Sequence, residues 1–181
     1  MKTRNVPLRG RSLALALIGA LFVSLALAQH AEHAPAKAKK RAPALAMGAA
    51  FAPSGELWVV ALDEQLRLTV QTSADEGRTW AAPRVLARGD DAISADGENR
   101  PKIAFGPNGQ VVISYTQPLA KPYTGAIRML RSADGGRNFS PPFTVHADRQ
   151  VITHRFESIA FDAQGTLHTL WVDKRRSEER R

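Results

Sequence analysis

The 181-residue chain contains no cysteine, which excludes disulfide bonds, thiolate metal ligands, a cysteine nucleophile and a lipoprotein anchor. Aromatic residues make up only 7% of the chain, and glycine and proline are too scarce for a collagen-like or wholly disordered chain. Hydrophobic residues nevertheless reach 44%, so a packed core must supply the stability. The length leaves room for one folded domain.

The net charge of +8 does not indicate a nucleic-acid partner once it is divided along the chain. Four basic residues and no acidic residue precede residue 29, and segments 29–44 and 174–181 are both basic. The central residues 45–173 carry 12 basic and 14 acidic side chains. A groove that follows phosphates needs a basic surface, so we predict no nucleic-acid partner.

The first 28 residues have the pattern of a secretory signal peptide. A basic start is followed by the uncharged run Leu13–Ala28, which ends in the small-x-small sequence Ala26-Leu27-Ala28. The alternative is a membrane anchor, but a run of 16 residues is shorter than the roughly 20 that a spanning helix needs. We therefore predict export to the periplasm or the medium, no membrane attachment after cleavage, and a flexible linker over residues 29–44.

An internal repeat organises the remaining chain. Three Ala-Phe pairs, ending at Phe51, Phe105 and Phe161, are each followed four residues later by a glycine and then by an apolar run. This pattern predicts three β-hairpins whose second strands cover Leu57–Leu62, Val111–Thr116 and Leu167–Val172. The spacings of 54 and 56 residues leave room for two further strands in each unit.

A second motif lies in that additional length. The sequence SADEGRTW at residues 73–80 recurs as SADGGRNF at 132–139, each time between strand-like runs. Serine and aspartate side chains can bond the backbone of a tight turn, glycine accepts the left-handed conformation, and the aromatic residue can pack beneath the sheet. We assign a structural role to its polar, glycine and aromatic positions: Ser73, Asp75, Gly77, Trp80, Ser132, Asp134, Gly136 and Phe139.

This Ser-x-Asp-x-Gly-x-Thr-Trp pattern resembles the Asp box (BNR repeat) of the sialidase-like β-propellers, and the resemblance extends over about residues 46–173. The resemblance implies an all-β fold: a partial propeller of about two and a half four-stranded blades in a domain of residues 45–173. The blades are expected at residues 46–87, 101–147 and 157–173. Members of this family have six blades, so the ring cannot close. Residues 174–181 form a charged tail, and the unpaired blade edge is expected to favour self-association.

The ends of the strands opposite the Asp boxes are the expected binding face. The resemblance implies a cluster of arginines that pair with a sugar carboxylate, and the positions that partly match it are Arg155, Arg175 and Arg100, with Asp173 beside them. It also implies an acid/base aspartate and a tyrosine nucleophile activated by glutamate. Neither has a match in this chain, so we assign no catalytic residue.

Other polar groups give weaker patterns. The acidic segment Asp90, Asp91, Asp96 and Glu98 could surround calcium, but its spacing favours a solvated loop. His30 and His33 lack further ligands, and His146, His154 and His168 show no metal-binding spacing. We therefore predict no metal and no cofactor, and we expect Tyr123 to pack within its loop.

Two classes of function remain open. The first is a sialidase-like glycoside hydrolase acting on sialic-acid-type sugars, of which this chain is an incomplete part without turnover of its own. The second is a non-catalytic exported propeller that binds a glycan or a protein.

Overall fold

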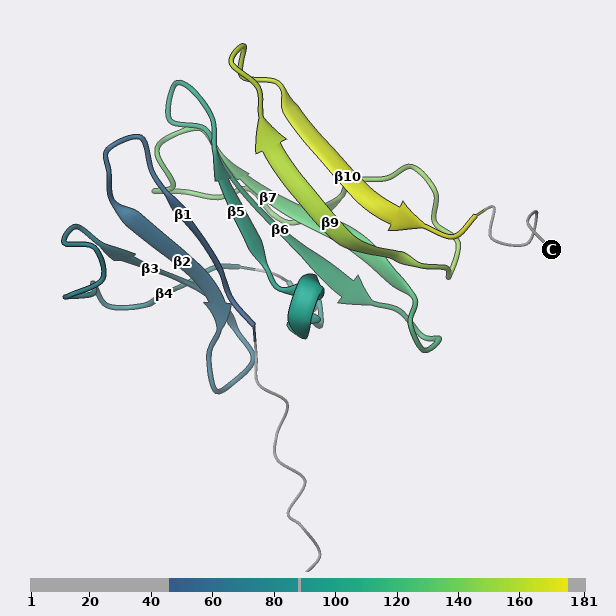
Figure 1. Ribbon diagram of the computed structural model, residues 1–181. Helices are drawn as coiled ribbons and strands as arrows, with labels where there is room; N and C mark the ends of the chain where they lie inside the picture. Colours follow the sequence, from purple (N-terminus) through teal and green to yellow (C-terminus); the bar gives the residue numbers. More distant parts are fainter. Residues whose placement is uncertain (1–45, 88, 176–181) are drawn as a thin grey trace, which may run out of the picture. The chain divides into compact units, whose positions relative to one another are not determined.

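The computed structural model describes residues 46–87 and 89–175, and these fold into three antiparallel sheets (Figure 1). The first sheet contains β1 (Gly48–Phe51), β2 (Leu57–Leu62), β3 (Leu68–Ser73) and β4 (Arg84–Val85), in that order. A short 3₁₀ turn, η1 (Gly97–Asn99), leads to the second sheet of β5 (Lys102–Phe105), β6 (Val111–Pro118), β7 (Gly125–Ser132) and β8 (Phe143–Thr144). The third sheet pairs β9 (His154–Phe161) with β10 (Leu167–Asp173).

The three predicted hairpins have one register. Phe51 pairs with Leu57, Phe105 with Val111 and Phe161 with Leu167. The turn glycines Gly55, Gly109 and Gly165 have φ values of 87°, 77° and 84°, a left-handed conformation that glycine adopts without steric cost. The repeat therefore corresponds to a repeated backbone geometry.

The main apolar core lies between the first and second sheets. Alternate residues of β2 are buried, which places Trp58, Val60 and Leu62 on one face of the first sheet. This face packs against β6, whose Ile113 and Tyr115 are fully buried. Burying these side chains is the principal source of stability in a chain without disulfides.

The first strands of the three sheets lie side by side, with β5 between β1 and β9 (Figure 1). The approach of β1 to β5 is close at Gly48, because a Cβ atom there would overlap the carbonyl oxygen of Pro101. Glycine at this position lets the two backbones come together, and it brings the segment before β5 next to the start of β1.

The all-β prediction is confirmed for the described residues, which contain no α-helix and no helix long and apolar enough to span a membrane. The sheets do not close into a ring. One boundary was wrong: β9 begins at His154 rather than near Glu157, so Arg155 lies inside the strand. The predicted signal peptide (1–28), the linker (29–44) and residues 176–181 of the charged tail lie outside the described residues.

Candidate functional site

A hollow of about 320 Å³ lies where β1, β5 and β9 meet. It is lined by Gly48 and Ala49 of β1, by residues that precede and begin β5, and by Phe156–Ile159 of β9. Its charged members are Glu98, Arg100, Lys102 and Glu157. We call this the inner-strand hollow. It lies at the ends of the strands away from the Asp-box turns, which is the face that the sequence analysis favoured for binding.

Glu157 is fully buried at the hollow and connects the second and third sheets. Its carboxylate accepts hydrogen bonds from Ser114 Oγ (3.0 Å) and Thr116 Oγ1 (3.1 Å), both on β6. Lys102 Nζ lies 3.7 Å from the same carboxylate. A buried carboxylate is tolerated because these partners replace its hydration, so Glu157 fixes β9 against the second sheet.

Lys102 places a positive charge within the hollow. Its ammonium group donates to the carbonyl oxygens of Glu98 (2.8 Å) and Arg100 (3.1 Å), and only 15% of its side chain is exposed. Burial lowers the pKa of Lys102, while the nearby Glu157 carboxylate acts in the opposite direction. The ammonium group therefore has fixed partners on one side and faces the hollow on the other.

Arg100 lies before the first strand of its sheet, as predicted, and contributes to the hollow's wall. Its guanidinium pairs with Glu98 at 3.0 Å, and 38% of the side chain remains exposed. Such a pair is weak in water, so a ligand can compete for this guanidinium at little cost.

Arg155 is turned away from the hollow. Its Nε donates to Asn99 Oδ1 (3.2 Å), Nη2 lies 3.8 Å from Asp96, and the guanidinium stacks on the ring of Phe156. The cause is an irregularity in β9, where Phe156 has a φ of 59° and the pairing shifts between Leu170 and Val172. The match to the arginine cluster that the resemblance implies does not account for this irregularity.

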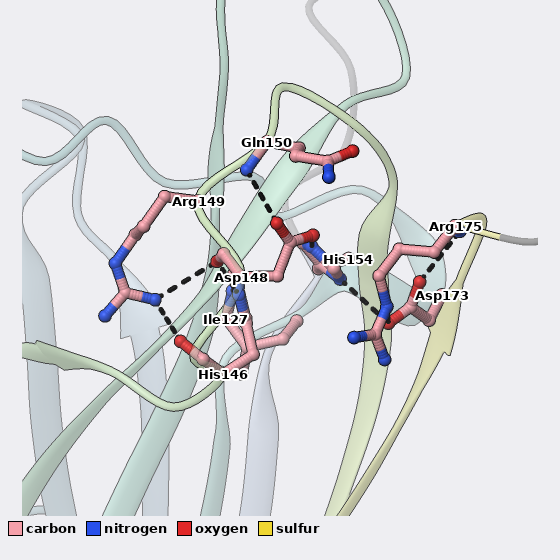
Figure 2. Close-up of polar contacts among 8 residues, drawn as sticks. All are labelled: Ile127, His146, Asp148, Arg149, Gln150, His154, Asp173 and Arg175. Carbon is pink, nitrogen blue, oxygen red and sulfur yellow. Dashed lines mark hydrogen bonds and ion pairs between the residues drawn. The ribbon is translucent and has the colours of Figure 1, made fainter.

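Asp173 and Arg175 form a pair of their own at the end of β10 (Figure 2). Arg175 Nε lies 2.7 Å from Asp173 Oδ2, and the Arg175 backbone N–H donates to Oδ1. Burial alone would raise the pKa of Asp173, but these interactions and the charge of His154 lower it overall. Neither residue is among those lining the inner-strand hollow.

A pair of buried histidines accompanies Asp173, and sequence reasoning missed it. The rings of His146 and His154 stack with centroids 3.8 Å apart and planes inclined by 33°. Asp148 lies 3.1 Å from His154 Nε2, and Asp173 lies 3.5 Å from His154 Nδ1 (Figure 2). No spacing rule could have found this cluster, because it forms only when the 145–153 connection folds back over the start of β9.

The acidic segment after the first sheet does not gather its carboxylates. Asp91 accepts from Tyr115 Oη (2.6 Å) and Arg128 Nε (2.7 Å), while Asp96 bonds Asn99 and Glu98 pairs with Arg100. No group of three or more potential metal ligands occurs among residues 46–87 and 89–175. Burial, together with Asp91, raises the pKa of Tyr115, which marks this network as a fixed internal contact.

The two turns of the repeated motif, at residues 73–80 and 132–139, contain the same hydrogen bonds. Asp75 Oδ1 accepts from the Thr79 N–H at 2.7 Å and Asp134 Oδ1 from the Asn138 N–H at 2.9 Å, and each carboxylate also accepts from its serine. Bonds from the Thr79 side chain and backbone lower the pKa of Asp75 to about 2. These aspartates act within the turns and lie on the face opposite the hollow.

Two predictions about aromatic side chains were wrong. Trp80 does not pack beneath the sheet: 42% of it is exposed and its Nε1 donates to the Gly77 carbonyl. Tyr123 does not pack within its loop either, since 80% of it is exposed and its φ is 62°. Phe139, by contrast, packs against the core as expected.

No family model and no curated protein sequence matches the chain. Similar solved structures include the Hadza microbial sialidase Hz136, with 22% identity over 72% of this chain and 32% of that chain and a TM-score of 0.46. A K499G mutant of the NanB sialidase from Streptococcus pneumoniae matches with 16% identity over 70% of this chain and 21% of that chain (TM-score 0.45). A polysaccharide lyase of the PL25 ulvan lyase family matches with 14% identity over 72% and 37% (TM-score 0.44).

The chain thus spans between a fifth and two fifths of the length of these three structures. All three are carbohydrate-active enzymes. Likeness at this level concerns the fold alone, and the functional argument therefore rests on the chain's own residues.

Proposed function

We propose that this chain is part of an exported sialidase-like propeller and that its inner-strand hollow binds a glycan. The observation that carries the proposal is the placement of Arg100 and Lys102 beside Glu98 and Glu157 in a hollow of about 320 Å³. Sugars are bound by closely spaced charged and polar groups that accept and donate hydrogen bonds, and guanidinium also pairs with the carboxylate of an acidic sugar.

We further propose that the 181 residues alone do not hydrolyse a glycosidic bond. Hydrolysis requires one carboxyl group that protonates the leaving oxygen and a second group that attacks or activates water. Of the two carboxylates at the hollow, Glu157 already accepts from two hydroxyls and lies near Lys102, and Glu98 is paired with Arg100. Glu157 therefore has fixed partners, and Glu98 alone cannot supply both the proton donor and the attacking group.

The second candidate is a non-catalytic exported propeller that binds a glycan or a protein without any related enzymatic activity. One observation favours it: Arg100, Arg155 and Arg175 each face a carboxylate of this chain, namely Glu98, Asp96 and Asp173. The three arginines therefore do not form the open cluster that the resemblance to sialidases implies.

Titration of the purified chain with sialyllactose and with lactose tests the binding proposal. We expect saturable binding of at least one of them, and Arg100→Ala should weaken it by about tenfold through the loss of one charged hydrogen bond. Arg78→Ala is the matched control, because Arg78 also pairs with a glutamate two residues away, but on the Asp-box side. Binding of neither sugar, or equal losses in the two variants, would refute the proposed site.

Export is tested separately by the mass of the protein recovered outside the cytoplasm. We expect cleavage after Ala28 and a mature chain that begins at Gln29. A chain that still begins at Met1 and stays with the membrane fraction would contradict this proposal.

A further inference from the structure

His154, the first residue of β9, is held between carboxylates from two different segments. Its side chain is fully buried, with Nε2 facing Asp148 of the 145–153 connection and Nδ1 facing Asp173 at the end of β10 (Figure 2). The connection belongs to the chain leaving the second sheet, whereas Asp173 belongs to the third. One imidazole therefore lies where the two sheets are joined.

The neighbouring histidine is held neutral by its hydrogen bonds. His146 Nε2 accepts from the Ile127 N–H (3.2 Å), which leaves Nδ1 as the protonated nitrogen that donates to the Asp148 carbonyl (2.7 Å). A second proton on Nε2 would point at the Ile127 N–H. Burial, followed by the charges of His154 and Arg149, lowers the pKa of His146. The ring that stacks on His154 therefore brings no competing positive charge.

His154 has two acceptors but, when neutral, only one N–H. Its Nε2 is 3.1 Å from Asp148 Oδ2, a hydrogen-bond distance, whereas Nδ1 makes no hydrogen bond within the described residues and is 3.5 Å from Asp173 Oδ2. A doubly protonated imidazole would donate to both carboxylates. A neutral one must leave a nitrogen lone pair facing a buried carboxylate, which is unfavourable.

The other charged groups around the cluster favour ionised carboxylates. The Gln150 N–H, followed by His154, lowers the pKa of Asp148, and the pKa of Asp173 is lowered beside Arg175. Two further charged residues lie beside the cluster: the Arg149 guanidinium donates to the carbonyl oxygen of His146, and the Lys174 N–H donates to the Thr153 carbonyl. From β7, only backbone groups of Gly125 and Ile127 face the cluster.

We propose that His154 is a proton-operated latch that fastens the 145–153 connection, which leaves the second sheet, to the start of the third sheet: closed when the imidazole carries two protons and bridges Asp148 and Asp173, and loosened when it carries one. Imidazole changes its charge between about pH 5 and 8, so the latch responds to mild changes in the pH of the surrounding solution. Because β9 also supplies Phe156–Ile159 to the inner-strand hollow, loosening this strand alters the hollow's wall.

The chain contains a matched control for this latch. His168 Nε2 lies 3.0 Å from Asp162 Oδ2, with the same six-residue separation as Asp148 and His154. The side chain of His168 is 61% exposed and faces one carboxylate only, whereas His154 is buried between two. Solvent can satisfy His168 in either protonation state, so its pair provides no latch.

Thermal unfolding of the full chain at pH 5.5 and 7.5 tests the proposal. We expect His154→Gln to lower the Tm by about 2–4 °C more at pH 5.5 than at pH 7.5, in line with one buried charged hydrogen bond that exists only in the closed latch. His168→Gln should lower the Tm equally at the two pH values, and the comparison with the unchanged chain removes the opposite pH dependence that the lowered pKa of His146 brings. Equal pH dependence in the two variants would overturn the latch.

Histidine NMR of the unchanged chain gives a second test that does not depend on a variant folding. We expect the ring nitrogens of His154 to go from two protons to one as the latch opens with rising pH, with His146 singly protonated at Nδ1 throughout. Asp148→Asn and Asp173→Asn should each disfavour the doubly protonated ring. A His154 that stays neutral at pH 5.5 would refute the proposal, as would a doubly protonated His146.

Discussion

The turns at residues 73–80 and 132–139 have the same internal hydrogen bonds but different surroundings. In the first, Gly77 N–H donates to Ser73 Oγ at 2.8 Å, and in the second, Gly136 N–H donates to Ser132 Oγ at 2.9 Å. The first turn is largely exposed, including Trp80. The second packs against the first sheet, where the ring of Trp58 lies directly over Gly136.

An arginine reinforces only the second turn. Arg84, on β4 of the first sheet, donates to the carbonyls of Gly136 and Arg137, and its guanidinium lies 5.7 Å from the centre of the Phe139 ring. The turn's hydrogen bonds are thus set by its own sequence, whereas the burial of its aromatic residue depends on the neighbouring sheet. The motif therefore stabilises only its own turn at residues 73–80, whereas at residues 132–139 it also joins the first sheet to the second.

The largest expected difference between the turns comes from replacing their glycines. Gly136 has a φ of 80°, and an alanine Cβ there would lie 2.7 Å from Trp58 Cη2. We expect Gly136→Ala to lower the free energy of unfolding by about 2–4 kcal/mol, through backbone strain and overlap together. Gly77→Ala brings the same backbone strain, but its Cβ would lie 3.4 Å from its nearest neighbouring atom. We therefore expect it to lower the free energy of unfolding by about 1–2 kcal/mol. Urea unfolding measures both, and equal losses would contradict the joining role of the second turn.

Truncating the aromatic residues should give a smaller difference in the same direction. Phe139→Ala removes a side chain packed against the core and should cost about 2 kcal/mol, less than the 3–5 of a fully buried ring. Trp80→Ala removes a ring that is 42% exposed and should cost less than Phe139→Ala. If Trp80→Ala lost more stability than Phe139→Ala in thermal or urea unfolding, the exposed fraction of the ring would not predict the order of the two losses.

Acid should affect both turns alike, which is the smallest expected difference. Bonds from Thr79 lower the pKa of Asp75 to about 2, and the Asn138 N–H, first among several bonds, lowers that of Asp134. A lowered folded-state pKa contributes stability above the ordinary value near 3.8, and that stability is lost as pH falls through the folded value. Urea unfolding at pH 5, 4 and 3 should therefore show that the free energy of unfolding declines with falling pH. This decline should be shallower in both Asp75→Asn and Asp134→Asn than in the unchanged chain. If either variant kept the pH dependence of the unchanged chain, the aspartate of that turn would not contribute to stability in this way.

The sequence was a good guide to the strands because their signals are local and repeated. The hairpin glycines and apolar runs placed Leu57–Leu62 correctly and found the other second strands to within two residues. The start of β9 was misplaced because Phe156 interrupts the alternation. The exposure of Trp80 depends on which sheet covers a turn, and a repeat pattern does not contain that information.

The candidate site was less predictable than the strands. Arg100 lies before the first strand of its sheet and lines the hollow, but Lys102 and Glu157 were not recognised, because their importance comes from contacts between different sheets. The His146–His154 pair depends on the path of a connecting segment that has no regular periodicity.

Turnover of a fluorogenic sialoside by the purified mature chain, with its size measured in parallel, tests the account most directly. We predict no hydrolysis, because the buried Glu157 is held by Ser114 and Thr116, and Glu98 alone cannot supply both the proton donor and the attacking group. Sustained hydrolysis by a monomer would contradict it and would require a catalytic group among the residues assigned here to structure.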